Sequence, residues 1–357
     1  MKYLLNHPLY RNDLRTIATA PFMPWEKLQD ASVLLSGATG MIGSCLIDAI
    51  LFKNQECGLN CTVFALSRKR VKAHSRFSGW GDSPYLRIVE GDVNTSIALP
   101  DNVSCDYVLH LASNTHPVAY ATDPIGTITT NIIGTHNMLE LACHASAKRF
   151  LFASSNEVYG ENRGDQEFFD ESYMGYIDCN TLRAGYPESK RCGEALCQAY
   201  RAQRGLNVVI ARLTRSFGPT LLPSDTKAMS QFLRNGIRGE DIVLKSTGFQ
   251  FYSYTYTVDA VTGLLTTLLQ GGDGEAYNIA DTRCDIRLKD LAALIASCTG
   301  THVIFDLPNA TESAGFSKAT KARLNGFKLS ELGWTIRFPL EEAIPRTLKI
   351  LKDLEQG

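Results

Sequence analysis

The sequence of 357 residues lacks the residue spacings by which metal-binding and disulfide-rich proteins are recognised. It contains ten cysteines and seven histidines, but no two cysteines are spaced as Cys-x-x-Cys and no histidines accompany them at zinc-ligand spacing. We therefore expect no metal site. Scattered free thiols in this number are typical of a reducing compartment.

Long apolar runs are also missing. The first 24 residues show no apolar run framed by basic residues, so they do not read as a signal peptide, and no membrane span is expected elsewhere. The net charge is −1, which gives nucleic acid and acidic membranes no overall attraction to the chain. The sequence therefore predicts a soluble cytoplasmic protein whose partner is a small molecule rather than nucleic acid or a membrane.

Strand-like apolar runs and helical patterns alternate from residue 32 onward. Strands are expected over 32–38, 61–67, 85–93, 105–112, 149–155 and 207–217, and helices over 41–53, 123–145 and 184–204. This alternation predicts an α/β fold, a doubly wound parallel sheet of the Rossmann type covered on both faces. Beyond residue 219 the pattern weakens, with expected helices over 227–236, 288–298 and 339–354 and an aromatic strand over 249–258.

These patterns suggest a division of the chain into three parts. Residues 1–29 form an N-terminal extension, expected to contain a short helix on the surface. Residues 30–219 form the dinucleotide-binding domain. Residues 220–357 form mostly a smaller substrate-binding lobe, with elements at about 250–280 returning to the main domain.

A glycine-rich loop follows the first expected strand and opens the first expected helix. The spacing of Gly37, Gly40 and Gly43 is typical of a turn in which the backbone approaches a pyrophosphate at the helix N-terminus. Other expected cofactor contacts in this loop are Thr39, Met41 and Ile42. The loop predicts NAD or NADP as the cofactor.

Arg68 follows the second expected strand, where NAD-specific sites place an acid for the ribose hydroxyl. An arginine there suits the additional phosphate of NADP, which favours NADP over NAD as the cofactor. The alternative interpretation is an ordinary solvated basic turn.

Tyr186 and Lys190 are four residues apart, and therefore lie on one face of an expected helix. A tyrosine with an ordinary pKa near 10 is a poor base at neutral pH. A neighbouring ammonium group lowers that pKa, so that the phenolate can accept a hydroxyl proton while hydride leaves the same carbon. The pair predicts hydride chemistry on a hydroxyl group.

With these motifs in this order, the chain resembles the extended short-chain dehydrogenase/reductase family, in its branch of nucleotide-sugar epimerases, dehydratases and decarboxylases. The resemblance covers roughly residues 30–350. The matching segments are Gly37–Gly43, Gly91–Val93, His110–Ser113, Asn131–Thr135, Ser154–Gly160, Tyr186–Lys190, Ala211–Arg212 and Phe217–Pro219.

The resemblance implies a set of site residues. The implied cofactor contacts are Asp92, Val93, Leu111, Ala112, Ser113, Asn131, Tyr186 and Lys190. The implied catalytic residues are Tyr186, Lys190, Ser155, Asn156 and Glu157. The expected substrate contacts are Ser113, Ser155, Asn156, Arg215 and Tyr252. Purely structural alternatives remain: Asp92 as a turn cap, Ser155 as a satisfied strand-end hydroxyl, and His110 as a packed strand histidine.

Members of this family oxidise a sugar at C4 and then differ in the second step. Glu157 stands where the dehydratases and decarboxylases carry a glutamate that acts at C5. Asn156 stands where hexose dehydratases carry an acid for the leaving hydroxyl, and an amide has no such proton to give. Decarboxylases need no such acid, and some epimerases carry Asn at this position. The second step therefore stays open among the three reactions.

Two departures from the family pattern concern the substrate. Tyr252 stands where relatives usually have an Arg for a diphosphate or a carboxylate, and Arg215 stands where they usually have an Asn. The positive charge is kept but moved, so we expect Arg215 to bind an anionic group of the substrate. The alternative is an outward-facing arginine paired with a surface acid.

Two other functions remain as alternatives: an NAD(P)H-dependent carbonyl reductase on the same fold, and an NAD(P)-sensing binding protein without turnover. An intact Tyr186 and Lys190 argue against the second. The resemblance also implies a homodimer, formed by helices over 123–145 and 184–204. The apolar residues expected at that interface include Ile132, Ile133, Leu196 and Tyr200.

Overall fold

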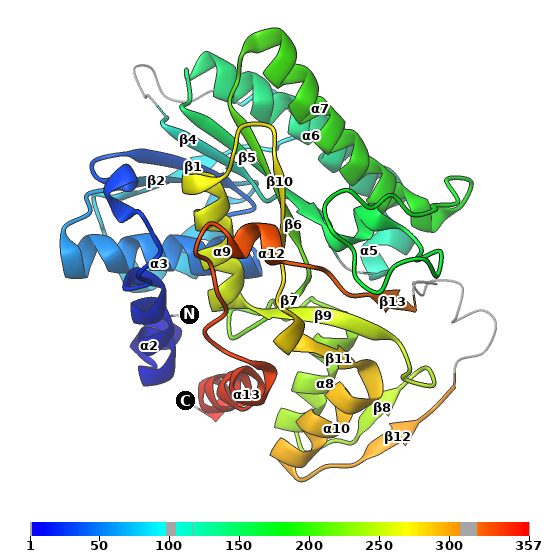
Figure 1. The fold of residues 1–357 in the computed structure, drawn as a ribbon. Coiled ribbons are helices and arrows are strands. Elements are labelled where there is room, and N and C mark those ends of the chain that lie inside the picture. Colours follow the sequence, from blue (N-terminus) through cyan, green and yellow to red (C-terminus); the bar gives the residue numbers. More distant parts are fainter. Residues whose placement is uncertain (1, 98–104, 116, 308–319, 357) are drawn as a thin grey trace.

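The computed structural model describes residues 2–97, 105–115, 117–307 and 320–356. Its centre is a parallel sheet of seven strands in the order β10-β6-β5-β4-β1-β2-β3 (Figure 1). The strands are β1 (Ser32–Ser36), β2 (Thr62–Ser67), β3 (Leu86–Glu90), β4 (Tyr107–His110), β5 (Arg149–Ser155), β6 (Val208–Leu213) and β10 (Ala276–Ile279). The predicted doubly wound parallel sheet is therefore confirmed.

Helices cover both faces of this sheet. The helices α6 (Pro124–His144) and α7 (Gly185–Arg204) pack together on one face, whereas α3 (Met41–Cys57) and α9 (Thr257–Gln270) lie on the other (Figure 1). Successive residues of a strand point to opposite faces, so Leu34 of β1 joins the core under α6 and α7 while Leu35 joins the core under α3 and α9. Both faces are buried, which is why these strands are apolar without alternation.

The N-terminal segment contains helices that bury one face in the core and leave the other face exposed. After α1 (Lys2–Asn6), the helix α2 (Pro8–Ala18) packs against α3, α9 and the last helix, α13 (Leu340–Gln356). Its buried face carries Tyr10, Leu14 and Ile17, which recur at helical spacing. Their burial against three helices makes α2 a structural layer of the main domain.

The expected strand over 207–217 divides at Thr214, which lies between β6 and β7 (Arg215–Phe217). The strand β7 leaves the central sheet and pairs with β9 (Phe251–Tyr256), with Arg215 opposite Tyr254. The strand β9 also pairs with β11 (Asp285–Arg287) and β13 (Lys321–Ala322). A second, smaller sheet therefore begins where the central sheet ends.

The remaining described elements form a lobe beside this second sheet (Figure 1). They are α8 (Ala228–Ile237), β8 (Ile242–Leu244), α10 (Leu288–Thr299) and β12 (Val303–Phe305). Between them in sequence, α9 and β10 return to the main domain, where β10 is an edge strand of the central sheet. The helix α12 (Phe327–Ser330) packs against β10.

Candidate active site at the carboxyl edge of the sheet

The glycine loop joins the end of β1 to the start of α3, with Gly40 at the N-cap of the helix. Gly37 has a φ of +70°, and a Cβ atom there would lie 2.7 Å from the backbone carbon of Leu111. A Cβ atom on Gly43 would lie 2.4 Å from the carbonyl oxygen of Gly37. Only glycine fits this cradle, whose free N–H groups at a helix N-terminus suit a dinucleotide pyrophosphate.

His110 and Ser36 hold the end of β4 against this loop. The hydroxyl of Ser36 accepts hydrogen bonds from the backbone N–H groups of Leu111 (3.2 Å) and Ala112 (3.3 Å) and lies 2.7 Å from Nδ1 of His110. Burial, with the charge of Lys190, lowers the pKa of His110 to about 3, so its ring is neutral. This histidine is packed in its strand, and it braces the two implied cofactor residues Leu111 and Ala112.

A chain of hydrogen bonds links other implied cofactor residues to α7. Ser113 donates to the amide oxygen of Asn131 (2.7 Å), and the amide nitrogen of Asn131 donates to Ser189 (2.9 Å). Ser189 in turn donates to the backbone oxygen of Tyr186 (2.9 Å). Asn131 is fully buried with both amide atoms bonded, so its contribution is to position Ser113 and the first turn of α7.

The remaining expected cofactor residues, Asp92, Val93 and Arg68, have ordinary structural surroundings. Asp92 accepts the backbone N–H of Asn94 (2.9 Å), which is the turn-capping role named as its structural alternative. Val93 packs under α6, where a Cβ atom on Gly134 would approach it to 2.8 Å. Arg68 is exposed at the end of β2.

Tyr186 lies in the first turn of α7, beside Ser155 at the end of β5. The ring centroids of Tyr120 and Tyr186 are 4.9 Å apart. Burial raises the pKa of Tyr186 well above its ordinary value, and the charge of Glu157 adds to the rise. Ser155 and Tyr120 lower the pKa of Tyr186, but by less than burial raises it.

Lys190 does not have the predicted effect on Tyr186 in the chain alone. Its ammonium group donates to the backbone oxygen of Ala153 (2.8 Å) and lies 4.8 Å from the ring centroid of Phe152. Burial lowers the pKa of Lys190 to about 7, so its charge is weakened near neutral pH. The prediction that Lys190 lowers the pKa of Tyr186 was wrong here, because burial dominates both groups. Base strength at Tyr186 therefore depends on charges that arrive with the ligands.

Glu157 is held by Arg183, a residue that the sequence analysis missed. One terminal nitrogen of Arg183, Nη2, lies 2.8 Å from Oε1 and 2.7 Å from Oε2 of Glu157. The guanidinium also lies 4.8 Å over the ring of Tyr120. Burial lowers the pKa of Arg183, but the charge of Glu157 outweighs it and leaves the pKa raised. The only available signal was the position of Arg183 three residues before Tyr186, in the turn that leads into α7.

Asn156 and Ser155 belong to the same turn at the end of β5. Ser155 caps the short 3-10 helix Asn156–Tyr159 by accepting the backbone N–H of Glu157 (3.2 Å), and Asn156 is buried beside it. Ser155 therefore has the capping role of its structural alternative and also contacts Tyr186. The structure places Tyr186 beside Ser155 and Tyr120 and pairs Glu157 with Arg183. Asn156 is buried directly after Ser155, and Lys190, one turn after Tyr186, donates to Ala153 of β5.

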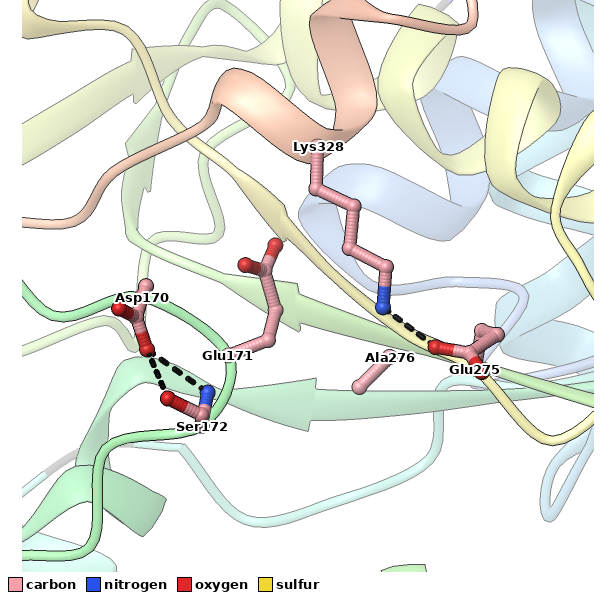
Figure 2. Close-up of a pocket in the computed structure, with 6 residues that line it drawn as sticks. All are labelled: Asp170, Glu171, Ser172, Glu275, Ala276 and Lys328. Atoms are coloured by element: carbon pink, nitrogen blue, oxygen red, sulfur yellow. Dashed lines mark hydrogen bonds and ion pairs between the residues drawn. The ribbon is translucent and has the colours of Figure 1, made fainter.

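A separate pocket lies beside β10 and contains none of the implied site residues (Figure 2). Lys328 forms an ion pair with Glu275 (2.5 Å) at one side, and Asp170 accepts two hydrogen bonds from Ser172 at the other. Glu171 points between them and accepts the backbone N–H of Asn278 (2.7 Å). These acidic groups are satisfied by neighbours within the protein, so we assign the pocket no function.

Comparison with protein families places the chain. The model of the NAD dependent epimerase/dehydratase family matches residues 33–280, more than half of the sequence. The chain belongs to this family. UDP-glucuronic acid decarboxylase 1 of Xenopus tropicalis is 31% identical over 324 residues, which are 90% of this chain and 73% of the relative. UDP-glucuronic acid decarboxylase 3 of Arabidopsis thaliana is 30% identical over 88% of this chain and 86% of the relative.

Solved structures agree in fold. A UDP-glucose 4-epimerase of Thermotoga maritima, solved with UDP-glucose, has a TM-score of 0.76 and 23% identity over 91% of this chain and 99% of its own. A dTDP-glucose 4,6-dehydratase of Streptomyces venezuelae, solved with NAD, has a TM-score of 0.78 and 23% identity over 91% of this chain and 98% of its own. At this identity the likeness supports the fold alone.

Together these findings confirm the predicted family and fold, and the matching family is one of NAD-dependent enzymes. The matching family is described as NAD dependent, so the preference for NADP that Arg68 suggested is not supported. Among the described residues, no helix is both long and apolar enough to span a bilayer. The described His, Cys, Asp and Glu side chains form no group of three or more that could hold a metal.

Proposed function

We propose that this chain decarboxylates a nucleotide-linked uronic acid by transient oxidation at C4 of the sugar. The observation that carries the proposal is that Tyr186, Ser155 and Glu157 lie together and that Asn156, buried directly after Ser155 in the chain, stands where a dehydratase would need an acid. A dehydratase needs an acid for its leaving hydroxyl, and the Asn156 amide has no proton to give it. Decarboxylation has no such requirement. The similarity to UDP-glucuronic acid decarboxylases over 90% of the chain supports the same choice.

One group of residues would bind the cofactor, and another would act on the sugar. Bound NAD would supply the hydride acceptor for the transient oxidation at C4. The glycine loop would hold its pyrophosphate, and Leu111, Ala112 and Ser113 would line its cleft. Tyr186 would exchange a proton with the C4 hydroxyl, and Ser155 would orient that hydroxyl.

The second step follows from the chemistry of a β-keto acid. With a ketone at C4, the bond from C5 to the carboxyl carbon can break, and carbon dioxide leaves. The electron pair of the broken bond passes into an enolate that spans C5, C4 and the C4 oxygen. The phenol of Tyr186, which would carry the proton taken from the C4 hydroxyl, can donate a hydrogen bond to the enolate oxygen. Uptake of one proton from water at C5 then regenerates the C4 ketone, which would take back the hydride together with the phenol proton. Glu157, fixed by Arg183, is the residue that the family resemblance assigns to action at C5.

A panel of nucleotide sugars tests the proposal. Purified enzyme with NAD is incubated with UDP-, dTDP-, CDP- and GDP-linked glucuronic acid and glucose, and products are followed by mass spectrometry and NMR. We expect loss of carbon dioxide from one of the uronic acids. A 4-epimer of unchanged mass, or loss of water from a glucose derivative, would replace decarboxylation with the other family reactions.

We also propose a homodimer that acts in the cytoplasm. All ten cysteines are free, which suits a reducing compartment. Ile125 and Ile133 on α6 expose 76% and 44% of their surface, so this helix has an uncovered apolar face. Tyr200 does not contribute to it, because its hydroxyl bonds to Glu140 and to His136 (2.8 Å) within the same chain.

A further inference from the structure

Arg215 and Tyr252 are in close contact across two neighbouring strands. Arg215 is the first residue of β7, and Tyr252 lies on the neighbouring strand β9. The guanidinium carbon of Arg215 is 3.5 Å from the centroid of the Tyr252 ring, so the cation lies directly on the phenol. The side chains of Tyr252 and Tyr254 are buried, and Arg215 is only half-buried. The arginine is therefore held in place at the edge of the core.

The charge of Arg215 is not neutralised by any carboxylate in the described part of the chain. Comparable arginines are paired: Arg183 with Glu157 (2.7 Å), Arg212 with Glu194 (2.7 Å) and Arg323 with Asp285 (2.8 Å). Nη1 of Arg215 is buried and has no hydrogen-bond partner among the described residues. Withdrawing a charged donor from water without a partner is costly, and an anion bound there would offset that cost.

The position of Arg215 connects it to the candidate catalytic cluster. Burial raises the pKa of Tyr252, while Arg215 and Arg183 lower it and Glu157 raises it, so all three charges act on this one phenol. Arg183 and Glu157 neutralise each other in their ion pair. Arg215, stacked on Tyr252, therefore carries a positive charge that no described carboxylate pairs with, which suits an anionic ligand group.

We propose that Arg215, laid on the ring of Tyr252, is the subsite for an oxyanion of the substrate. The shared chemistry is a carboxylate or phosphate oxygen that accepts hydrogen bonds from the guanidinium. The identity of that anion rests on the proposed function, under which it is the sugar carboxylate or a phosphate of the nucleotide. Tyr252 acts as a platform that keeps the guanidinium oriented toward the ligand.

Binding measurements on Arg215→Gln test this subsite, with Arg238→Gln as the control because Arg238 is an exposed arginine at the end of α8. UDP, UDP-glucose and UDP-glucuronic acid are titrated by calorimetry in the presence of NAD. If the anion is the carboxylate, Arg215→Gln loses about 10-fold or more in affinity for UDP-glucuronic acid only. If it is a phosphate, all three ligands weaken by a similar factor. Affinities equal to those of the control for all three ligands would overturn the subsite.

A second readout separates this inference from the proposed function. If the wild-type protein with NAD binds none of the UDP-, dTDP-, CDP- or GDP-linked uronic acids, the proposed function fails, and the probes become inorganic phosphate and free glucuronate. A rise in melting temperature with either anion that is present in the wild type and in Arg238→Gln but absent in Arg215→Gln would keep the anion subsite. Equal shifts in all three proteins, or no shift in any, would overturn it.

Discussion

Tyr186 is surrounded by groups that act on its acidity in opposite directions. Burial and the charge of Glu157 raise its pKa, whereas Ser155, Arg183 and Tyr120 lower it. The sequence predicted the tyrosine, the serine and the glutamate from local motifs. It could not predict the direction of the pKa shift, because that depends on how deeply the phenol is buried and on Arg183 and Tyr120. Neither of these belongs to a recognisable pattern: Arg183 precedes α7 directly in the chain, whereas the fold brings Tyr120 to it.

Replacing Tyr186 with Phe should abolish most turnover while preserving the fold. The variant keeps the ring against Tyr120 but loses the hydroxyl that exchanges the proton, so kcat should fall on the order of 10² or more. Product formation is measured by mass spectrometry, and NAD affinity by fluorescence titration. Tyr176→Phe is the matched control, because Tyr176 is exposed and lies outside the candidate site. Turnover by Tyr186→Phe close to that of the control would rule out this role.

Asp48 stabilises the join between the N-terminal helices and the main domain. Its carboxylate is fully buried in α3 and accepts hydrogen bonds from Tyr10 (2.7 Å), Arg76 (2.6 Å) and Trp80 (2.8 Å). Asp48→Ala leaves the Arg76 charge buried without its partner, which should cost roughly 3–5 kcal/mol of unfolding free energy.

Urea unfolding at pH 7 measures this cost. Glu56→Ala, which removes the exposed ion pair with Arg11 (3.4 Å), is the control and should change stability by less than about 1 kcal/mol. Equal stabilities of the two variants would show that Asp48 does not hold the N-terminal helices in place.

Secondary-structure elements differ in how well the sequence predicts them. The strand β5 matched its predicted range of 149–155, because a fully buried strand gives a continuous apolar run. The helix α9 was not predicted. It is buried nearly all round, and its polar residues at helical spacing, Asp259, Thr262 and Thr266, are buried as well. The split between β6 and β7 also escaped prediction, since a strand that changes sheets keeps the same residue composition. That split is what brings Arg215 to Tyr252.

The proposed dimer can be tested on α6 alone. Ile125→Glu places a charge on the exposed apolar face of this helix without touching the core, so it should shift a dimer toward monomer. Light scattering coupled to size exclusion at micromolar concentration reports the mass. Ile304→Glu is the control, because Ile304 is an exposed isoleucine of β12 in the other lobe. A wild-type protein that is already monomeric would contradict the proposal.

Two buried carboxyl groups make the stability of the whole molecule depend on pH. Burial raises the pKa of Asp13 to about 6, against hydrogen bonds from Tyr256 and Arg346. Burial raises the pKa of Asp259 to about 7, against the backbone N–H groups of Arg337 (2.7 Å) and Phe338 (3.3 Å). Both groups lie where the N-terminal helix, α9 and the C-terminal segment meet, so their ionisation affects three distant parts of the chain.

Their contribution should favour the folded state at low pH. Because both folded-state pKa values lie above that of an unfolded aspartate, near 4, the folded chain binds more protons between about pH 4 and 7. The stabilisation from these groups is complete below pH 4 and is lost as the pH rises through 6 and 7. Asp259→Asn should therefore flatten the change in unfolding free energy between pH 5 and 8, measured with urea. A pH dependence identical to that of the wild type would refute this assignment.

The central claim is that hydride leaves C4 of a nucleotide-linked uronic acid and returns to the same carbon within one catalytic cycle. Incubation with UDP-glucuronic acid carrying deuterium at C4, followed by mass spectrometry and NMR of the product, tests it directly. The account predicts a pentose nucleotide that keeps its deuterium at C4, formed without accumulation of reduced NAD. A decarboxylated product that has lost the label, or one reduced cofactor released for each sugar consumed, would contradict it.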